Sequence, residues 1–255
     1  SALYGADALG GVVNILTSRP PGGVHVRTEA VTGSFGLQGY RVECSANLGN
    51  LGVLSGYGSE RGRNDFPFET VSSSGLDTSL ASENSDFVRR QFYVHGTLAV
   101  DEQSTASVSA QYVVADRGTP SPFSPLARQS DDDVNCSLSY DRTGEDGTSW
   151  KISASYHYSL QDYNDPNPLF PYRTFYKNIY ASVNPQFRFN LSEHDIVTVG
   201  GELSQGTLES PDFDTEVMRV QKAVYVSHES RFESNRELFH RIILYQTIRY
   251  DRISD

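Results

Sequence analysis

The stretch Ser149–Ser159, which reads SWKISASYHYS, places apolar and polar side chains at alternating positions. Its even positions carry Trp, Ile, Ala and Tyr, whereas its odd positions carry Ser, Lys and His. Successive side chains of a β-strand point to opposite faces of the sheet. This period of two therefore predicts an amphipathic strand with one apolar face and one polar face.

The same alternation recurs along most of the chain, for example over Gln38–Leu48, Thr105–Val114 and Asn178–Phe189. Helical stripes with apolar residues three and four positions apart are hard to find. The pattern predicts about eleven strands, near 24–32, 37–48, 51–61, 87–100, 104–116, 132–143, 148–160, 174–190, 195–205, 218–231 and 238–253.

The connections between these strands alternate in length. Short polar turns are expected at Leu48–Asn50, Asp101–Gln103, Thr143–Gly147, Leu191–Asp195 and Glu233–Glu237. Longer connections are expected at Gly62–Asp86, Arg117–Gln129, Gln161–Arg173 and Gly206–Val217. An antiparallel meander with short turns at one end and long loops at the other is typical of outer-membrane barrels. We therefore predict an all-β, antiparallel up-and-down transmembrane β-barrel; a soluble lectin-like sandwich is a weaker alternative.

The apolar face also has the residue distribution of a lipid-facing surface. Trp150 opens its strand, and Phe187 and Phe189 close theirs, which predicts aromatic girdles at headgroup depth. Lys177 and Lys222 interrupt this face a few residues below long loops, where a charge costs little. The opposite, polar face predicts a lumen that is wet or filled by another polar element.

Composition excludes several other classes. The chain has 255 residues and a formal net charge of −11, which argues against a nucleic-acid partner. No stretch approaches the ~18 apolar residues of a membrane-spanning helix. Cys44 and Cys136 lie far apart and outside any metal or redox motif, so both are interpreted as small apolar fillers.

The first residues carry a different signal. Ser1–Thr17 reads SALYGADALGGVVNILT, a glycine-punctuated turn that runs into a short apolar strand. This string resembles the end of the plug domain of TonB-dependent outer-membrane receptors, where a similar run leads into the barrel. The residues that match the run are Tyr4, Gly5, Ala8, Gly10, Gly11, Val12, Asn14, Ile15 and Thr17. Asp7 and Asn14 are interpreted as holding the turn and strand of the plug.

The resemblance implies that 1–20 is the C-terminal end of a plug and that 21–255 is the N-terminal part of a barrel. Such barrels have about 22 strands, so the chain is expected to be a fragment. The implied function is TonB-dependent import of a scarce nutrient chelate, a ferric siderophore or cobalamin, across the bacterial outer membrane. The implied partners are outer-membrane lipid, lipopolysaccharide, and TonB through an N-terminal region outside this chain. A passive porin or structural barrel is the alternative.

No catalytic constellation is predicted, and no cofactor. The six histidines are dispersed, and none is paired with Cys or Asp at a motif spacing. Ser159 and Asp162 lie near His157, but no nucleophile-elbow sequence surrounds them. We therefore expect a protein that is not an enzyme.

The outer loops hold the candidates for ligand contact. Asp131, Asp132 and Asp133 supply oxygen donors that could bind calcium, as do the acidic residues of 162–165 and 212–216. Simple solvation of these carboxylates is the alternative interpretation. Phe170, Tyr172 and Arg173 form a candidate substrate-capture surface, with loop self-packing as its alternative.

Overall fold

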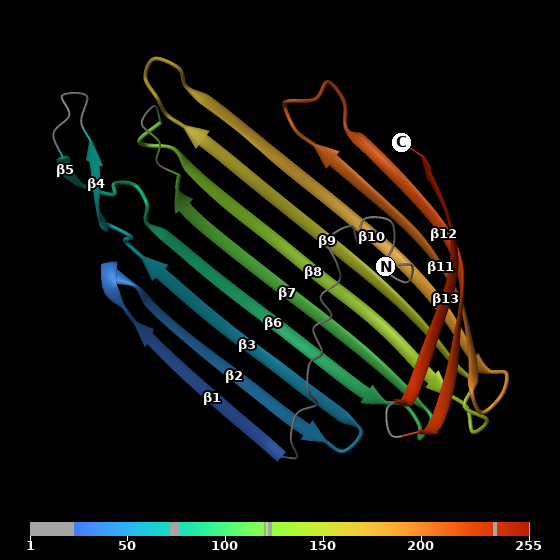
Figure 1. Cartoon of the computed structure of the whole chain (residues 1–255). Helices are drawn as coiled ribbons and strands as arrows, with labels where there is room; N and C mark the ends of the chain where they lie inside the picture. The colour runs from blue at the N-terminus through green and yellow to red at the C-terminus, as the bar shows by residue number, and fades with distance from the viewer. Residues whose placement is uncertain (1–22, 72–76, 120, 122–123, 237–238, 255) are drawn as a thin grey trace.

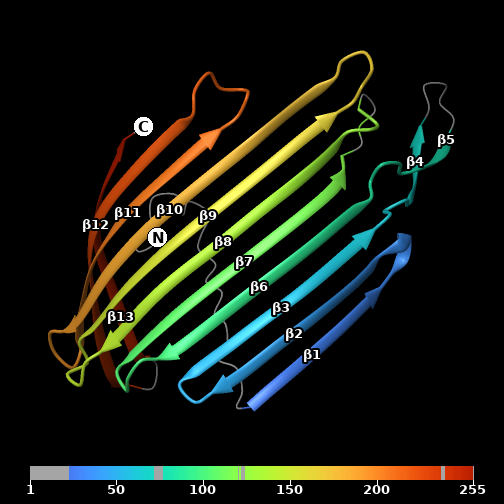
Figure 2. The ribbon, with the colours of Figure 1, turned by 180° about the vertical axis from the view of Figure 1, so that it is seen from behind.

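A computed structural model describes residues 23–71, 77–119, 121, 124–236 and 239–254, and the plug motif lies outside them. The main sheet of the described chain is antiparallel and has 11 strands, in the order β1-β2-β3-β6-β7-β8-β9-β10-β11-β12-β13, so that neighbours in the sheet are also neighbours in sequence except where β4 and β5 come between β3 and β6. The strands lie side by side in a broad, tilted and curved sheet (Figures 1 and 2). The predicted up-and-down meander is confirmed.

The bounds of the sheet strands are β1 Gly23–Thr32, β2 Gln38–Leu48, β3 Leu51–Gly62, β6 Phe87–Ala99, β7 Ser104–Gly118, β8 Arg128–Thr143, β9 Ser149–Asp165, β10 Tyr172–Asn190, β11 Asp195–Glu209, β12 Val217–Arg236 and β13 Phe239–Ser254. A 3-10 turn, Ser34–Gly36, joins β1 to β2. The turns at one end of the sheet are short, whereas the connections at the other end, called here the long-loop end, are longer except for the one between β1 and β2 (Figure 1).

The pairing register keeps apolar side chains together across all strands. In antiparallel pairs, directly opposite residues share a face. Ala110 lies opposite Cys136, which lies opposite Tyr156, which lies opposite Ala181. This set, with its equivalents on every strand, is called the apolar face. The other face, called the polar face, carries serines, amides and charges.

The side chains of the apolar face are more exposed than those of the polar face, as expected for the wall of a barrel. On the apolar face, Leu138 is 59% and Val224 is 62% exposed, whereas on the polar face Ser204 is 3% and Tyr225 is 8% exposed. Side chains converge on the concave side of a curved sheet and diverge on its convex side, so we take the polar face as concave. The sandwich alternative is wrong, because the apolar rows of the described sheet do not pack against a second sheet.

Two aromatic rows border the apolar face. Toward the short-turn end, Trp150 lies opposite Phe187, and its ring centroid is 4.9 Å from that of Tyr140. Toward the long-loop end, Phe92 lies opposite both Tyr57 and Tyr112. The first row contains Trp150 and Phe187, which the sequence predicted as part of a girdle, whereas the second row consists of residues that the sequence analysis did not name. That these rows lie at headgroup depth stays a prediction.

The structure differs from the prediction mainly at the long-loop end. β8 begins at Arg128 and β9 continues to Asp165, so residues expected in loops pair within strands. The connection from β3 to β6 contains a separate hairpin, β4 Pro67–Val71 and β5 Asp77–Ala81. Polar side chains beyond the apolar rows weaken the period-two signal, although backbone pairing continues there. Among the described residues, no helix has the length and apolar character to span a bilayer.

Candidate functional site

The long-loop end of the polar face gathers hydroxyl groups around one carboxylate. Asp212, in the connection between β11 and β12, accepts hydrogen bonds from three side chains of β10. The Tyr172 hydroxyl donates at 3.5 Å and the Thr174 hydroxyl at 3.3 Å, and the Tyr176 hydroxyl also donates. The three donors are two residues apart in the strand, so they share one face. This loop is therefore held over the mouth of the polar face.

A second group lies beside it on β7, β8 and β9. The Arg117 guanidinium is 3.1 Å from the Asp131 carboxylate, which also accepts a 2.7 Å hydrogen bond from the Gln129 amide. The rings of Tyr163 and Tyr172 have centroids 6.1 Å apart. We call these residues together the mouth cluster: Arg117, Gln129, Asp131, Tyr163, Tyr172, Thr174, Tyr176 and Asp212.

The mouth cluster has the chemistry of a surface that binds a polar ligand. It presents phenol, guanidinium, amide and carboxylate groups on one side of a single sheet. Aromatic rings with a polar tip give contact area together with hydrogen bonding. Its charges are already partly paired, so the cluster suits a ligand rich in oxygen atoms better than a bare cation.

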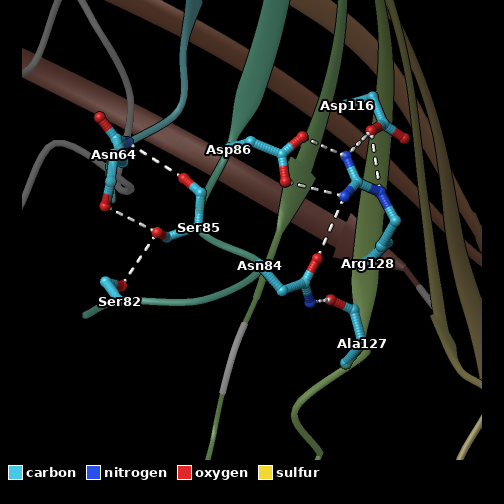
Figure 3. Close-up of polar contacts among 8 residues, drawn as sticks. All are labelled: Asn64, Ser82, Asn84, Ser85, Asp86, Asp116, Ala127 and Arg128. Atoms are coloured by element: carbon cyan, nitrogen blue, oxygen red, sulfur yellow. Dashed lines mark hydrogen bonds and ion pairs between the residues drawn. The ribbon is translucent and has the colours of Figure 1, made fainter. Parts of the chain in front are cut away.

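A different cluster, on the apolar-face side, fixes the loops at the rim (Figure 3). Arg128, the first residue of β8, donates two hydrogen bonds of 3.1 Å to the Asp86 carboxylate and others to Asp116 and Asn84. The hydrogen bond to Arg128 holds the pKa of Asp86 below its ordinary value. A bidentate pair of this kind has a defined geometry. It ties the connection before β6 to β7 and β8.

Hydrogen bonds to the backbone hold the same loop against β7 and β8. The Asn84 amide donates a 2.7 Å hydrogen bond to the carbonyl of Ala127, and the amide N–H of Gly118 donates to the carbonyl of Asp86 at 2.9 Å. A Cβ atom at Gly118 would lie 1.7 Å from the Asn84 carbonyl oxygen. Only glycine, which has no Cβ atom, allows the two backbone segments to come this close. The rim cluster is therefore structural and supports the mouth from outside.

Farther down the polar face, serines form a continuous row. Ser109, Ser137, Ser155, Ser182 and Ser204 lie opposite one another across five neighbouring strands. The Ser109 and Ser137 hydroxyls are 2.6 Å apart, and those of Ser155 and Ser182 are 2.8 Å apart. Small hydroxyl side chains leave room next to the sheet and keep its surface hydrophilic.

A group of charged side chains lies on the polar face at β11–β13. Arg249 lies 2.9 Å from the Glu202 carboxylate and 2.8 Å from that of Asp251, and its side chain is 7% exposed. Beside it, the Tyr225 ring covers Gly200, where a Cβ would meet that ring at 2.3 Å. Gln186 donates a 3.1 Å hydrogen bond to the Tyr225 hydroxyl.

The structure separates the predicted capture residues. Tyr172 belongs to the mouth cluster. Arg173 points to the apolar-face side, where it donates a 2.6 Å hydrogen bond to Asp162. Phe170 lies in the connection between β9 and β10 and is 78% exposed. One common surface for the three is not formed, because adjacent residues of a strand point to opposite faces.

The predicted calcium residues lie within β8 rather than in a loop. Asp131 and Asp133 are on the polar face, whereas Asp132 is on the apolar face, where it accepts a 3.1 Å hydrogen bond from Tyr112. Among described residues, no group of three or more His, Cys, Asp or Glu side chains is close enough to hold a metal ion. Calcium binding here stays a prediction that the placement does not favour.

Sequence reasoning missed most of the mouth cluster. Tyr163, Tyr176 and Arg117 received no role, although each has the parity of the polar face. Extending the alternation past the last apolar residue of each strand was the signal that could have found them. Asp212 was predicted only as one of the loop carboxylates that could bind calcium. Its hydrogen-bond partners on β10 depend on the tertiary structure and not on local sequence.

No protein-family model matches the sequence. Solved structures match the fold. A siderophore receptor, PirA from Pseudomonas aeruginosa, is 16% identical with a TM-score of 0.69, over 100% of this chain and 42% of its own. The FrpB iron transporter from Neisseria meningitidis is 12% identical with a TM-score of 0.73, over 91% of this chain and 40% of its own. The ferric enterobactin receptor PfeA is 13% identical with a TM-score of 0.67, over 99% and 43%.

The chain therefore has the fold of part of an outer-membrane receptor barrel, which confirms the predicted fold class. It spans about two fifths of the length of the structures that it matches. At these identities the similarity concerns the fold alone.

Proposed function

We propose that this chain is part of a TonB-dependent importer that carries a metal chelate of the siderophore class across the bacterial outer membrane. The observation that carries the proposal is the mouth cluster, a surface of tyrosine hydroxyls, guanidinium and carboxylate at the long-loop end of a barrel wall. The fold of that wall is shared with siderophore receptors and iron transporters.

The similar structures support a chelate as ligand. One of them is a receptor of the outer membrane bound to ferripyoverdine, which is a metal chelate. Another is a copper transporter, which supports a metal as cargo but does not itself indicate a chelate. Siderophores and their ferric complexes are rich in oxygen atoms, which tyrosine hydroxyls and Arg117 can bind by hydrogen bonds. Import requires no bond to be made or broken in the ligand, so the proposal assigns no catalytic residue.

The polar face supports coupling to a plug. A lumen lined by the serine row and by the Arg249 group suits an occupant that is itself polar. The N-terminal motif that resembles a plug precedes β1. We propose that residues 1–20 end such a plug and that force from TonB on its preceding part opens the path.

Uptake by cells tests the proposal. A strain lacking the gene for the full-length protein is complemented with the wild-type gene and given iron-labelled siderophores of catecholate and hydroxamate chemistry, or labelled cobalamin. We expect gene-dependent uptake of one ferric siderophore that disappears when TonB is deleted. Uptake that persists without TonB would instead indicate a passive porin, and uptake of cobalamin alone would change the substrate class.

Variants of the mouth cluster test the site. Replacing both Tyr176 by Phe and Asp212 by Asn removes the Tyr176 hydroxyl and the negative charge at position 212 while nearly keeping side-chain volume. We expect the half-saturation concentration for uptake to rise about tenfold, equivalent to one or two lost hydrogen bonds. The matched control is Tyr158→Phe, on the apolar face opposite Ile179, which should leave uptake unchanged. Equal half-saturation in all three proteins would exclude the mouth cluster as the site.

A further inference from the structure

The connection between β11 and β12 lies at the long-loop end, beside the start of β10 (Figure 1). Three hydroxyls of β10 donate hydrogen bonds to the carboxylate of Asp212 in this connection. They belong to Tyr172, Thr174 and Tyr176, called here the hydroxyl triad. The donors that the mouth cluster offers to a ligand on β10 are therefore engaged by an acceptor from the protein itself.

The attachment of this loop to β10 depends on that one side chain. Within the described part of the chain, no other side chain of 210–216 makes a hydrogen bond with β10. The remaining contacts are local, because the amide N–H groups of Asp212 and Phe213 donate to the Ser210 hydroxyl and carbonyl, both at 3.2 Å. Residues 211–216 are exposed. The loop can therefore separate from β10 without a change in the sheet.

A carboxylate is a close chemical match for the ligand atoms that the mouth cluster would bind. It only accepts hydrogen bonds, and its charge makes those bonds stronger than bonds to a neutral oxygen. The hydroxamate, catecholate and carboxylate oxygens through which siderophores hold ferric iron are anionic acceptors of the same kind. Each hydroxyl has one proton to donate. Asp212 and the chelate consequently compete for the hydroxyl triad.

We propose that Asp212 is an autoinhibitory latch, which occupies the hydroxyl triad until anionic oxygens of the chelate displace it and release the β11–β12 loop. This inference rests on the proposed function, because it takes the mouth cluster as the chelate site. The measured affinity is then the intrinsic affinity reduced by the fraction of molecules whose triad is free. By linkage, chelate binding must weaken the contact between the loop and β10 by the same factor.

Chelate binding to the purified full-length protein in mild detergent tests the latch. The probes are ferric hydroxamate and ferric catecholate siderophores with radiolabelled iron. Asp212→Ala leaves all three hydroxyls free, so we expect the dissociation constant of the chelate to fall about fivefold or more. Asp212→Asn keeps an acceptor oxygen without the charge and should give a smaller gain. Adding Tyr176→Phe reverses the gain, because that change removes a donor that the chelate needs.

Asp214 supplies the matched control. It is exposed in the same loop and carries the same charge, but it accepts no hydrogen bond from the hydroxyl triad. Asp214→Ala should therefore change the dissociation constant by less than about twofold, since an exposed charge is screened by salt. A gain equal to that of Asp212→Ala would assign the effect to the charge of the loop in general and would overturn the latch.

Amide hydrogen exchange of peptides covering 210–216, corrected for intrinsic rates, measures the loop directly. In the wild type, the chelate should accelerate this exchange, whereas a loop that closes over its ligand would exchange more slowly. Asp212→Ala should exchange fast without the chelate and should not change further when the chelate binds. Slower exchange of the wild-type loop in the complex would overturn the latch, as would an unchanged or weaker affinity of Asp212→Ala.

Uptake by cells separates the latch from the transport proposal. A protein that shows the latch in detergent but imports no chelate contradicts the transport proposal alone. A protein that imports the chelate while Asp212→Ala gains no affinity contradicts the latch alone. Failure of every chelate to bind would exclude the mouth cluster as the chelate site, and the latch with it.

Discussion

Single residues at the rim show how much of the mouth depends on one guanidinium. Arg128 contacts Asp86, Asp116 and Asn84, which come from the connection before β6 and from β7. Its side chain and that of Asp86 are only partly exposed. The fork geometry of arginine can satisfy several acceptors at once, which lysine cannot do. Arg128 therefore holds a loop and two strands together.

This arrangement predicts a pH dependence of the loop before β6. The pKa of Asp86 is lowered in the folded protein by its hydrogen bond to Arg128, so its stabilising effect is present at neutral pH. The effect is lost as the pH falls through that lowered pKa. Amide hydrogen exchange of residues 82–86, corrected for intrinsic rates, should therefore accelerate under acid conditions.

The variant Asp86→Asn should exchange faster at neutral pH and lose the acid-dependent step. Asp146→Asn is the control, because that carboxylate caps the turn between β8 and β9 at the opposite end of the sheet. It should leave exchange at 82–86 unchanged. Identical exchange of wild type and Asp86→Asn at neutral pH would contradict the role given to Arg128.

At the scale of the strand, neighbouring residues should tolerate charge very differently. Leu138 is on the apolar face and is 59% exposed, whereas Ser137 is on the polar face within the serine row. We expect Leu138→Arg to cost about 2–4 kcal/mol in folding into lipid, and Ser137→Arg less than about 1 kcal/mol. Equilibrium unfolding of the full-length protein from lipid vesicles measures both, and similar costs would refute the assignment of faces.

The pairing of β11, β12 and β13 brings Arg249 next to two carboxylates on the polar face, and these ion pairs contribute to the stability of the protein. Removing Arg249, with 7% of its side chain exposed, leaves two carboxylates facing each other. We expect Arg249→Met to destabilise by about 3–5 kcal/mol in the same unfolding assay. Lys151→Met is the matched control, because Lys151 is 46% exposed beside Asp141, and its loss should cost at most about 1 kcal/mol.

Adding Glu202→Gln to Arg249→Met should recover part of the lost stability, since one uncompensated carboxylate is then neutral. A simple sum of the two single losses would show that the three charges do not act as a group.

For the whole molecule, the described sheet has two outer strands, β1 and β13, and an exposed apolar face. Unpaired strand edges and apolar surface of this extent favour association in water. We expect residues 1–255, produced alone in buffer without detergent, to aggregate. Analytical ultracentrifugation and thermal unfolding test this, and a monomer with a cooperative transition would argue against a lipid-facing sheet.

Much of the architecture was predictable from sequence, because alternating hydropathy within a single strand indicates which residues share a face. The alternation at Ser149–Ser159 and its repeats gave the number of strands in the sheet, their order and which residues share a face. The same local signal failed beyond the membrane belt, at Arg128 and Asp162–Asp165, because polar residues there continue backbone pairing without alternating in hydropathy. The β4–β5 hairpin was hidden for the same reason.

The amino-acid sequence by itself determined that this chain forms an antiparallel sheet with one apolar and one polar face, since period-two patterning acts residue by residue. Only the tertiary structure decided which side chains meet across strands: Tyr176 with Asp212, and Arg128 with Asp86. These side-chain positions depend on strand register and strand tilt. Both arise from the pairing of whole strands, so no single segment of the sequence determines them.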